Sequence, residues 1–399
     1  MPHDQPPTLP APDATSAAHS ERVAAFIRGR ISAAGGRVSF AEFMQHALYA
    51  PGLGYYAAGS TKFGAAGDFI TAPEVSSVFG GVLARQCAEV LEQTDGGEIL
   101  EYGAGSGKLA VDALTALRRM DALPSAYNIF EVSADLRQRQ EVRLRECVPD
   151  LVKLVNWLDA PPAASRGVIL ANEVLDALPV ERFVRRDTGV MQQCVAHGQG
   201  GYGQGGFEFV EIAASARLAS AVMAIEDEIG RQFPDGFVSE VCLAVPDWIA
   251  GLSSALDEGV VLLFDYGVSR REYYAAERSD GWLRCHFRHH AHNDPLLLPG
   301  IQDLTSWVDF TAVAEAAVAV GFDIAGYSAQ AQFLLAGGLE AEMQGFAELA
   351  LEEQLELSRQ VKTLTLPGEM GEHFKCMALR KGAIATPSGF SLADRTHVL

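Results

Sequence analysis

Three glycines at alternate positions follow a short apolar segment in the stretch EYGAGSGKLA. They are Gly103, Gly105 and Gly107, and Glu101 opens the stretch. Glycine permits tight turns and lets a ligand approach the backbone closely. In a doubly wound sheet, a turn of this kind leads from the first strand into a helix, and ligands bind at the carboxyl ends of the strands. The stretch therefore predicts a cofactor site whose ligand is determined by neighbouring residues.

The neighbouring residues favour a cofactor that is cationic. The spacing G-x-G-x-G is neither the dinucleotide fingerprint nor a Walker loop, because no G-K-[ST] follows. A carboxylate at Glu101 is unfavourable beside a pyrophosphate but suits an ammonium or a sulfonium. Glu131, at the end of the next apolar segment, lies where an acid can accept hydrogen bonds from a ribose diol. These features predict S-adenosyl-L-methionine (SAM) rather than NAD, and an NAD(P) oxidoreductase is the weaker alternative.

A second polar group follows another apolar segment, in ILANEVLDALPVERF. Asn172, Glu173 and Asp176 come directly after residues expected to form a buried strand. Such residues often serve only as helix caps. Three of them beside a predicted cofactor turn favour direct roles in binding or catalysis. The stretch lacks the [DN]-P-P-[YF] signature, and the formal net charge is −20, so a nucleic-acid partner is not expected.

The pattern around these residues predicts an α/β fold. Short apolar segments alternate with helical ones, which favours a mostly parallel sheet covered on both faces. Two later strands are expected on either side of a helical segment at 339–366. The expected strands are 98–102, 127–132, 167–172, 238–245, 260–266, 321–328 and 373–380.

Composition, turn-forming residues and helix caps predict the domain boundaries. Residues 21–97 are expected to form N-terminal helices, with a capping box at Ser39 and Glu42, and a Gly-rich loop. The core is predicted at 98–275, interrupted by an insertion at about 190–236 that begins as a mobile Gly-rich loop. An accessory helical region with the late strands follows at 276–380. A disordered tail is expected at 1–20, and a second tail is expected at 381–399.

Bulk properties narrow the class of protein. The longest apolar runs are too short to span a bilayer, so no membrane span is expected. The first twenty residues resemble neither a signal nor a transit peptide, and the six cysteines form no C-x-x-C pair. A cytoplasmic location is predicted. The histidines of HFRHHAHNDP, residues 286–295, lack a recognisable ligand spacing, so we expect a polar loop there and no metal site.

Several segments together resemble one family, the MidA/DUF185 SAM-dependent methyltransferases. They are GDFITAPEVSSVFG, EYGAGSGKLA, NEVLDALPVERF, LLFDYG and DPLLLPGIQDLTSWVDFTAV. The resemblance runs from about residue 39 to residue 380. It implies a class I methyltransferase Rossmann-like sheet with an added N-terminal helical segment and a helical or irregular insertion region. Mitochondrial members of this family assist complex I assembly and methylate an arginine of a complex I subunit.

The resemblance implies a set of cofactor-binding residues and an N-terminal loop that closes over the cofactor. This set is Gly67, Asp68, Phe69, Thr71, Glu101, Gly103, Gly105, Gly107, Glu131 and Asn172. Tyr102 and Ser106 depart from the family pattern. Ser106 stands where the family often has arginine, which leaves one contact open.

If the acceptor is an arginine, paired carboxylates would hold its guanidinium. Glu173 and Asp176 are the candidate catalytic residues, with Glu74 and Asp265 as further candidates for contacting the substrate. The expected partner is a protein with an exposed arginine. Two alternatives stay open, a methyltransferase-fold assembly factor without turnover and a methyltransferase for another acceptor.

Overall fold

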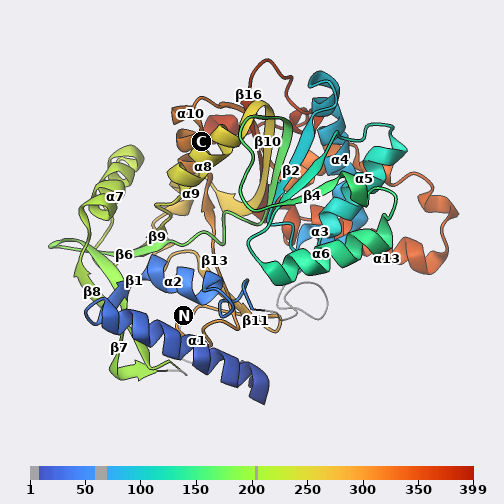
Figure 1. Ribbon diagram of the computed structural model, residues 1–399. Coiled ribbons are helices and arrows are strands. Elements are labelled where there is room, and N and C mark those ends of the chain that lie inside the picture. The colour runs from blue at the N-terminus through green and yellow to red at the C-terminus, as the bar shows by residue number, and fades with distance from the viewer. Residues whose placement is uncertain (1–8, 59–69, 203–204) are drawn as a thin grey trace. The chain divides into compact units, whose positions relative to one another are not determined.

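The computed structural model describes residues 9–58, 70–202 and 205–399, and these fall into two compact units (Figure 1). The first unit contains Ala177–Ala244, Arg271–Trp307 and the N-terminal residues up to Phe69. The second contains Ile70–Asp176, Val245–Arg270 and Val308–Leu399. Residues 1–8 of the expected tail lie outside the described residues. Gly67, Asp68 and Phe69 of the predicted cofactor loop lie outside them as well.

Within the described residues, the second unit is built on an eight-stranded sheet in the order β15-β16-β10-β5-β2-β3-β4, with β14 beside β10. Strands β4, β3, β2, β5 and β10 are parallel, and β16 lies antiparallel between β10 and β15. The strands are β2 (Glu98–Tyr102), β3 (Tyr127–Phe130), β4 (Val155–Leu158), β5 (Ser165–Asn172), β10 (Leu256–Val268), β14 (Val308–Asp309), β15 (Asp323–Ala329) and β16 (Phe374–Lys381). This order is that of a doubly wound α/β fold.

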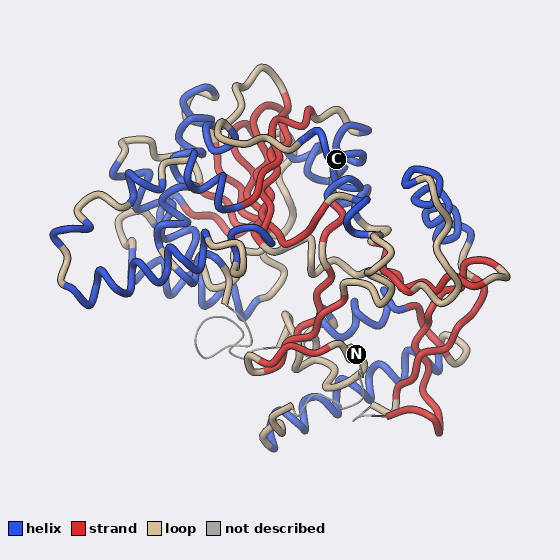
Figure 2. Tube along the Cα trace, turned by 180° about the vertical axis from the view of Figure 1, so that it is seen from behind, coloured by secondary structure: helices blue, strands red, loops and turns tan. Residues whose placement is uncertain are grey.

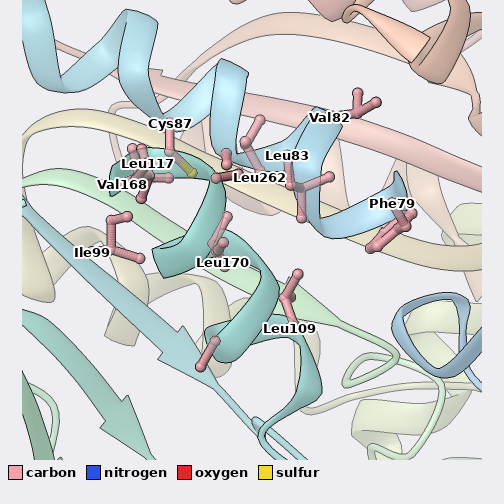
Figure 3. Packing of buried hydrophobic residues seen from close by; sticks show 14 of the residues in the cluster. Phe79, Val82, Leu83, Cys87, Ile99, Leu109, Leu117, Val168, Leu170 and Leu262 are labelled. Atoms are coloured by element: carbon pink, nitrogen blue, oxygen red, sulfur yellow. The ribbon is translucent and has the colours of Figure 1, made fainter. Parts of the chain in front are cut away.

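Helices cover both faces of this sheet (Figure 2). They are α3 (Ala72–Val75), α4 (Ser77–Gln93), α5 (Lys108–Arg119), α6 (Ala134–Cys147), α8 (Val245–Ala255), α10 (Phe310–Ala319), α11 (Gln330–Ala336), α12 (Leu339–Glu342), α13 (Leu351–Thr365) and α14 (Met370–His373). Side chains of α4 and α5, such as Leu83 and Leu117, pack on Ile99, Leu170 and Leu262 of the strands (Figure 3). Burial on both faces explains why the strands read as continuous apolar runs.

The first unit carries α1 (Ala14–Ala33), α2 (Phe40–Tyr49), α7 (Ala216–Ile229) and two antiparallel sheets. One sheet has the order β1-β7-β6-β9, with β8 beside β7, and the other is β12-β11-β13. The strands are β1 (Arg37–Ser39), β6 (Glu181–Arg186), β7 (Gly189–Tyr202), β8 (Phe207–Ala213), β9 (Val238–Val241), β11 (Leu283–Phe287), β12 (His290–His292) and β13 (Asp303–Ser306). The short helix α9 (Arg270–Tyr273) includes one of the positions where the chain passes from one unit to the other, between Arg270 and Arg271.

Most of the predicted strands are confirmed. The bounds of β2 agree with the prediction, β5 and β10 extend beyond theirs, and β3 stops two residues earlier. The capping box of Ser39 and Glu42 is present at the start of α2. The strand predicted at 238–245 does not join the parallel sheet. Its first residues form β9, which pairs antiparallel with β6. The prediction was wrong because a short apolar run does not reveal which strand it pairs with.

Both expected tails contain ordered residues. Helix α1 begins at Ala14, seven residues before the helical segment predicted at residue 21, because Asp13 Oδ1 accepts hydrogen bonds from the N–H groups of Thr15 and Ser16 at 3.0 Å. At the other end, Phe390 is 4% exposed, and its ring centroid lies 5.2 Å from that of Phe333. The segment 381–399, expected to be a tail, therefore belongs to the second unit and packs on it through Phe390.

The inserted part of the chain differs from the expectation in extent and in structure. The first part of the expected Gly-rich loop, up to Tyr202, continues strand β7, which pairs antiparallel with β8, and residues 203–204 lie outside the described residues. The first unit takes Ala177–Ala244 and Arg271–Trp307 rather than residues 190–236 alone. The predicted boundaries at 275 and 276 are therefore not those of the compact units.

Candidate active site

Three neighbouring parallel strands bring the predicted site residues to one edge of the sheet. Glu101 lies near the carboxyl end of β2, Asn172 ends β5, and Asp265 lies near the carboxyl end of β10. Strand β5 pairs with β2 on one side and with β10 on the other. The crevice at the carboxyl ends of such strands is the usual ligand site of a doubly wound sheet.

The glycine turn requires glycine for its conformation and its packing. Gly103, Gly105 and Gly107 have φ values of +64°, +53° and +80°, in the left-handed region. A Cβ at Gly103 would lie 3.2 Å from Val174, and one at Gly107 would lie 3.3 Å from the backbone of Gln140. The turn is thus closed tightly against two neighbouring segments, and Gly107 leads directly into α5.

Glu101 is held in a buried environment that fits a cationic ligand. The residue is 3% exposed, and its carboxylate accepts a hydrogen bond of 2.7 Å from the Tyr127 hydroxyl. Burial raises the pKa of Glu101 to about 7, the Tyr127 hydrogen bond opposes the rise, and the charge of Glu131 adds to it. A positive group beside Glu101 would favour its charged form.

Glu131 is tied to the glycine turn by Gln140 of α6. Glu131 Oε1 accepts from the Ser133 N–H at 2.9 Å, and Oε2 accepts from Gln140 Nε2 at 3.2 Å. The same Nε2 donates to the carbonyl of Gly105 at 3.0 Å. Sequence reasoning did not find Gln140, because a single glutamine on a charged helix has no motif to mark it.

Asp265 lies among the acidic residues that follow β5. It is 1% exposed, and its Oδ2 accepts from the N–H groups of Leu175 and Asp176 at 3.0 and 3.2 Å. Burial raises the pKa of Asp265 well above its ordinary value, and the charges of Asp176 and Glu173 raise it further. The three carboxyl groups are therefore within electrostatic range of one another.

The segment after β5 has an unusual backbone and a buried atom without a donor. Glu173 has φ +54°, a left-handed conformation that is uncommon for a residue other than glycine, and its N–H donates to the carbonyl of Phe264 at 2.8 Å. Asn172 Nδ2 donates to Glu173 Oε1 at 3.1 Å. Asn172 Oδ1 is buried and has no hydrogen-bond donor among the described residues, which fits a ligand that supplies one.

Glu74 joins the start of the second unit to the glycine turn. It lies on α3, and its Oε1 accepts from the hydroxyl of Ser106 and from Arg143 at 3.2 Å. Arg143 also donates to Ser106 Oγ at 2.8 Å. Ser106, the departure from the family pattern, is thus used to hold this network. Thr71 occupies the N-cap position of α3, without a side-chain cap.

The histidine-rich stretch forms strands. His286 lies on β11, and His290 and His292 lie on β12, which pairs with it. Among the described residues, no group of three or more His, Cys, Asp or Glu side chains could hold a metal ion. No helix in the described part of the chain is long and apolar enough to cross a membrane.

Comparisons with known proteins agree on one class of enzyme. The model of the Methyltransf_28 family, described as an S-adenosyl-L-methionine-dependent methyltransferase, matches residues 82–328. A COG1565 superfamily protein from Burkholderia thailandensis, solved with S-adenosyl-homocysteine (SAH), is 37% identical, with a TM-score of 0.91, over 98% of this chain and all of that one.

Two relatives of known name are protein arginine methyltransferases. The protein arginine methyltransferase NDUFAF7 homolog of Drosophila melanogaster is 28% identical, over 95% of this chain and 90% of that protein. NDUFAF7 of Danio rerio is 29% identical, over 85% of this chain and 82% of that protein. Both are named as mitochondrial proteins.

Proposed function

This chain belongs to the Methyltransf_28 (MidA-type) family of SAM-dependent methyltransferases, and from that premise we propose that it methylates an arginine side chain of a protein. The observation that carries the proposal is the acidic cluster of Glu173, Asp176 and Asp265, in which the buried Asp265 accepts the N–H groups of Leu175 and Asp176. Burial raises the pKa of Asp265, and the charges of Asp176 and Glu173 raise it further. A cationic guanidinium would relieve the repulsion within this cluster. Relatives named as protein arginine methyltransferases support the same acceptor.

We assign the cofactor to the edge of the sheet at β2 and β3. SAM supplies a methyl group on a positively charged sulfur. Glu101 and the glycine turn are proposed to hold its methionine end, and Glu131 its ribose. Asn172, whose buried Oδ1 lacks a donor among the described residues, is proposed to accept a hydrogen bond from the cofactor.

We assign the acceptor to Glu173 and Asp176. A guanidinium is planar and stays protonated at neutral pH, so two carboxylates can orient it through charge-assisted hydrogen bonds. In-line transfer needs the acceptor nitrogen to be aligned and water to be excluded. The methylated guanidinium keeps one positive charge, so one N–H proton must leave, and a cluster of mutually repelling carboxylates accepts a proton readily.

Two residues expected to contact substrate receive other roles. Asp265 accepts backbone N–H groups of Leu175 and Asp176 and is almost fully buried, so we propose that it positions the acceptor segment. Glu74 pairs with Arg143 and Ser106, so we propose that it anchors α3 to the glycine turn.

The test is to identify the residue that receives the methyl group. The purified chain is incubated with protein extract and SAM labelled on the methyl group, and the labelled protein is hydrolysed to amino acids. Labelled methylarginine is expected. Label in another residue would overturn the choice of arginine, and no transfer despite SAH binding would favour an assembly factor without turnover.

The family resemblance makes a complex I subunit the first acceptor to test. A cytoplasmic location, and the lack of a nucleic-acid partner, stay predictions from composition.

A further inference from the structure

We propose that Gln140 is a positioning residue that fixes the two ends of the cofactor site relative to each other. It lies on α6, outside every motif in the sequence, and its side chain is fully buried. The inference rests on the assignment of SAM to the glycine turn and Glu131.

The side-chain amide of Gln140 joins three different segments. Its Nε2 donates to the Gly105 carbonyl at 3.0 Å and to Glu131 Oε2 at 3.2 Å. Its Oε1 accepts from Trp157 Nε1 on β4 at 3.0 Å. Each hydrogen of the NH₂ group thus has an acceptor, and the carbonyl oxygen has a donor.

Chemistry determines which way this amide points. An indole N–H can only donate, whereas a backbone carbonyl and a carboxylate can only accept. A reversed amide would place the NH₂ group of Gln140 against the Trp157 N–H and its oxygen against two acceptors. Trp157 therefore sets the orientation in which Gln140 serves both Gly105 and Glu131.

The Gln140 contacts restrain the parts of the site that meet the cofactor. Gly105 has φ +53°, and the hydrogen bond to its carbonyl holds that peptide group in one orientation. The carboxylate of Glu131 is held on one oxygen by the Ser133 N–H and on the other by Gln140. The amide of Gln140 thus fixes the distance between the glycine turn, assigned to the methionine end of SAM, and Glu131, assigned to its ribose.

The inference predicts a specific loss of cofactor affinity in Gln140→Met, which keeps the length of the side chain but none of its hydrogen bonds. SAH binding, measured by titration calorimetry well below the melting temperature, should weaken about tenfold or more, which corresponds to ~1.4 kcal/mol. The Michaelis constant for SAM should rise in parallel, while kcat at saturating SAM stays near that of the wild type.

Gln86 provides a matched control. It is also fully buried and makes three hydrogen bonds, to Gly337, Ser388 and Gly389, none of which belongs to the glycine turn. Gln86→Met should lower the melting temperature but leave SAH affinity within about twofold, since buried hydrogen bonds contribute to stability wherever they lie.

A double-mutant cycle with Glu131→Gln tests whether Gln140 acts through Glu131. Gln140→Met should cost less SAH affinity in the Glu131→Gln background than in the wild type. SAH affinity of Gln140→Met within twofold of the wild type, with only its melting temperature lowered, would overturn the positioning role. Failure of the wild type to bind SAH would overturn the cofactor assignment and this inference together, whereas failure to label arginine would leave both standing.

Discussion

At the scale of single residues, two buried carboxyl groups have different hydrogen-bond partners and different proposed roles. Glu101 and Asp265 are both buried carboxyls near the ends of β2 and β10, the two strands that flank β5. Glu101 accepts a hydroxyl hydrogen bond from Tyr127, whereas Asp265 accepts backbone N–H groups. Burial is the largest cause of the raised pKa of each, and the acidic residues around Asp265 add a second.

The raised pKa of Glu101 predicts a pH-dependent cost to the fold. Above about pH 7 the buried group must be charged in the native state, whereas in the unfolded chain it ionises near its ordinary pKa of 4.5. The relative stabilisation that Glu101 gives is present at acid pH and is lost as the pH rises toward 7. Glu101→Gln should therefore stabilise the protein by up to ~3 kcal/mol at pH 8 and by little at pH 5.

Urea unfolding of Glu101→Gln at the two pH values measures this difference. Equal stabilisation at both would contradict the pKa. The variant should also bind SAH more weakly at pH 8, because its neutral amide lacks the charge that would pair with the ammonium of the cofactor.

The acidic cluster predicts a separation between binding and turnover. Glu173→Gln should lower kcat/KM for the protein acceptor about a hundredfold, the usual effect of losing one charge-stabilising group, while SAH affinity stays unchanged. Asp323→Asn, which alters an exposed acid on β15, is the control. Unchanged turnover in Glu173→Gln would remove this residue from the acceptor site.

Asp265 is predicted to act through its charge as well as its hydrogen bonds. Because its pKa is raised, activity that depends on a charged cluster should fall as the pH drops through that raised value. Asp265→Asn keeps an acceptor for the N–H groups of Leu175 and Asp176 but loses the charge. Its turnover should therefore be lower than that of the wild type at alkaline pH and should fall less steeply as the pH is lowered. An acid limb identical to that of the wild type would contradict this role.

At the scale of elements, the site depends on a turn that only glycine can form. The left-handed φ values and the short Cβ distances make the turn between β2 and α5 intolerant of side chains. The same turn is held from outside by α6 through Gln140 and by α3 through Glu74. Helices α3 and α6 therefore both restrain its shape.

Gly103→Ala tests the turn against a helical glycine. The left-handed conformation alone should cost about 1–2 kcal/mol of stability, and SAH binding should weaken as the turn opens away from Val174. Gly251 lies within α8 and has open space around it, so Gly251→Ala should stabilise by about 0.5–1 kcal/mol. Chemical denaturation and calorimetry of both variants measure the contrast, and normal SAH binding by Gly103→Ala would contradict it.

At the scale of the whole molecule, the described candidate residues all lie in the second unit. Thr71, Glu74, the glycine turn and both acidic groups belong to its chain segments. The first unit is assembled from three separate stretches of sequence, so it could not be recognised as a unit from any one of them.

This division predicts where SAH should slow amide hydrogen exchange. Protection should appear in the glycine turn, the start of α6 and the ends of β5 and β10, because these segments carry the assigned contacts. Helix α7 and strand β8 of the first unit should exchange at the same rate with and without SAH. Equal protection of α7 would contradict the assignment, and exchange measured by mass spectrometry decides it.

The sequence alone was sufficient to predict the fold class and the cofactor. The extent of β2, the glycine spacing and the acids at the strand ends are local patterns, since strand ends and tight turns are encoded by neighbouring residues. They predict a mostly parallel α/β sheet, which the strand pairing confirms, and SAM, which the family match and the SAH-bound relative confirm.

Only the tertiary structure decided what depends on contacts between distant segments. It showed that Gln140 bridges Gly105 and Glu131, and that Asp265 holds the segment after β5. It also placed β9 in an antiparallel sheet of the first unit and packed Phe390 against the second. Packing leaves an apolar pattern in each segment, but that pattern does not identify the partner segment, so a single sequence could not reveal these contacts.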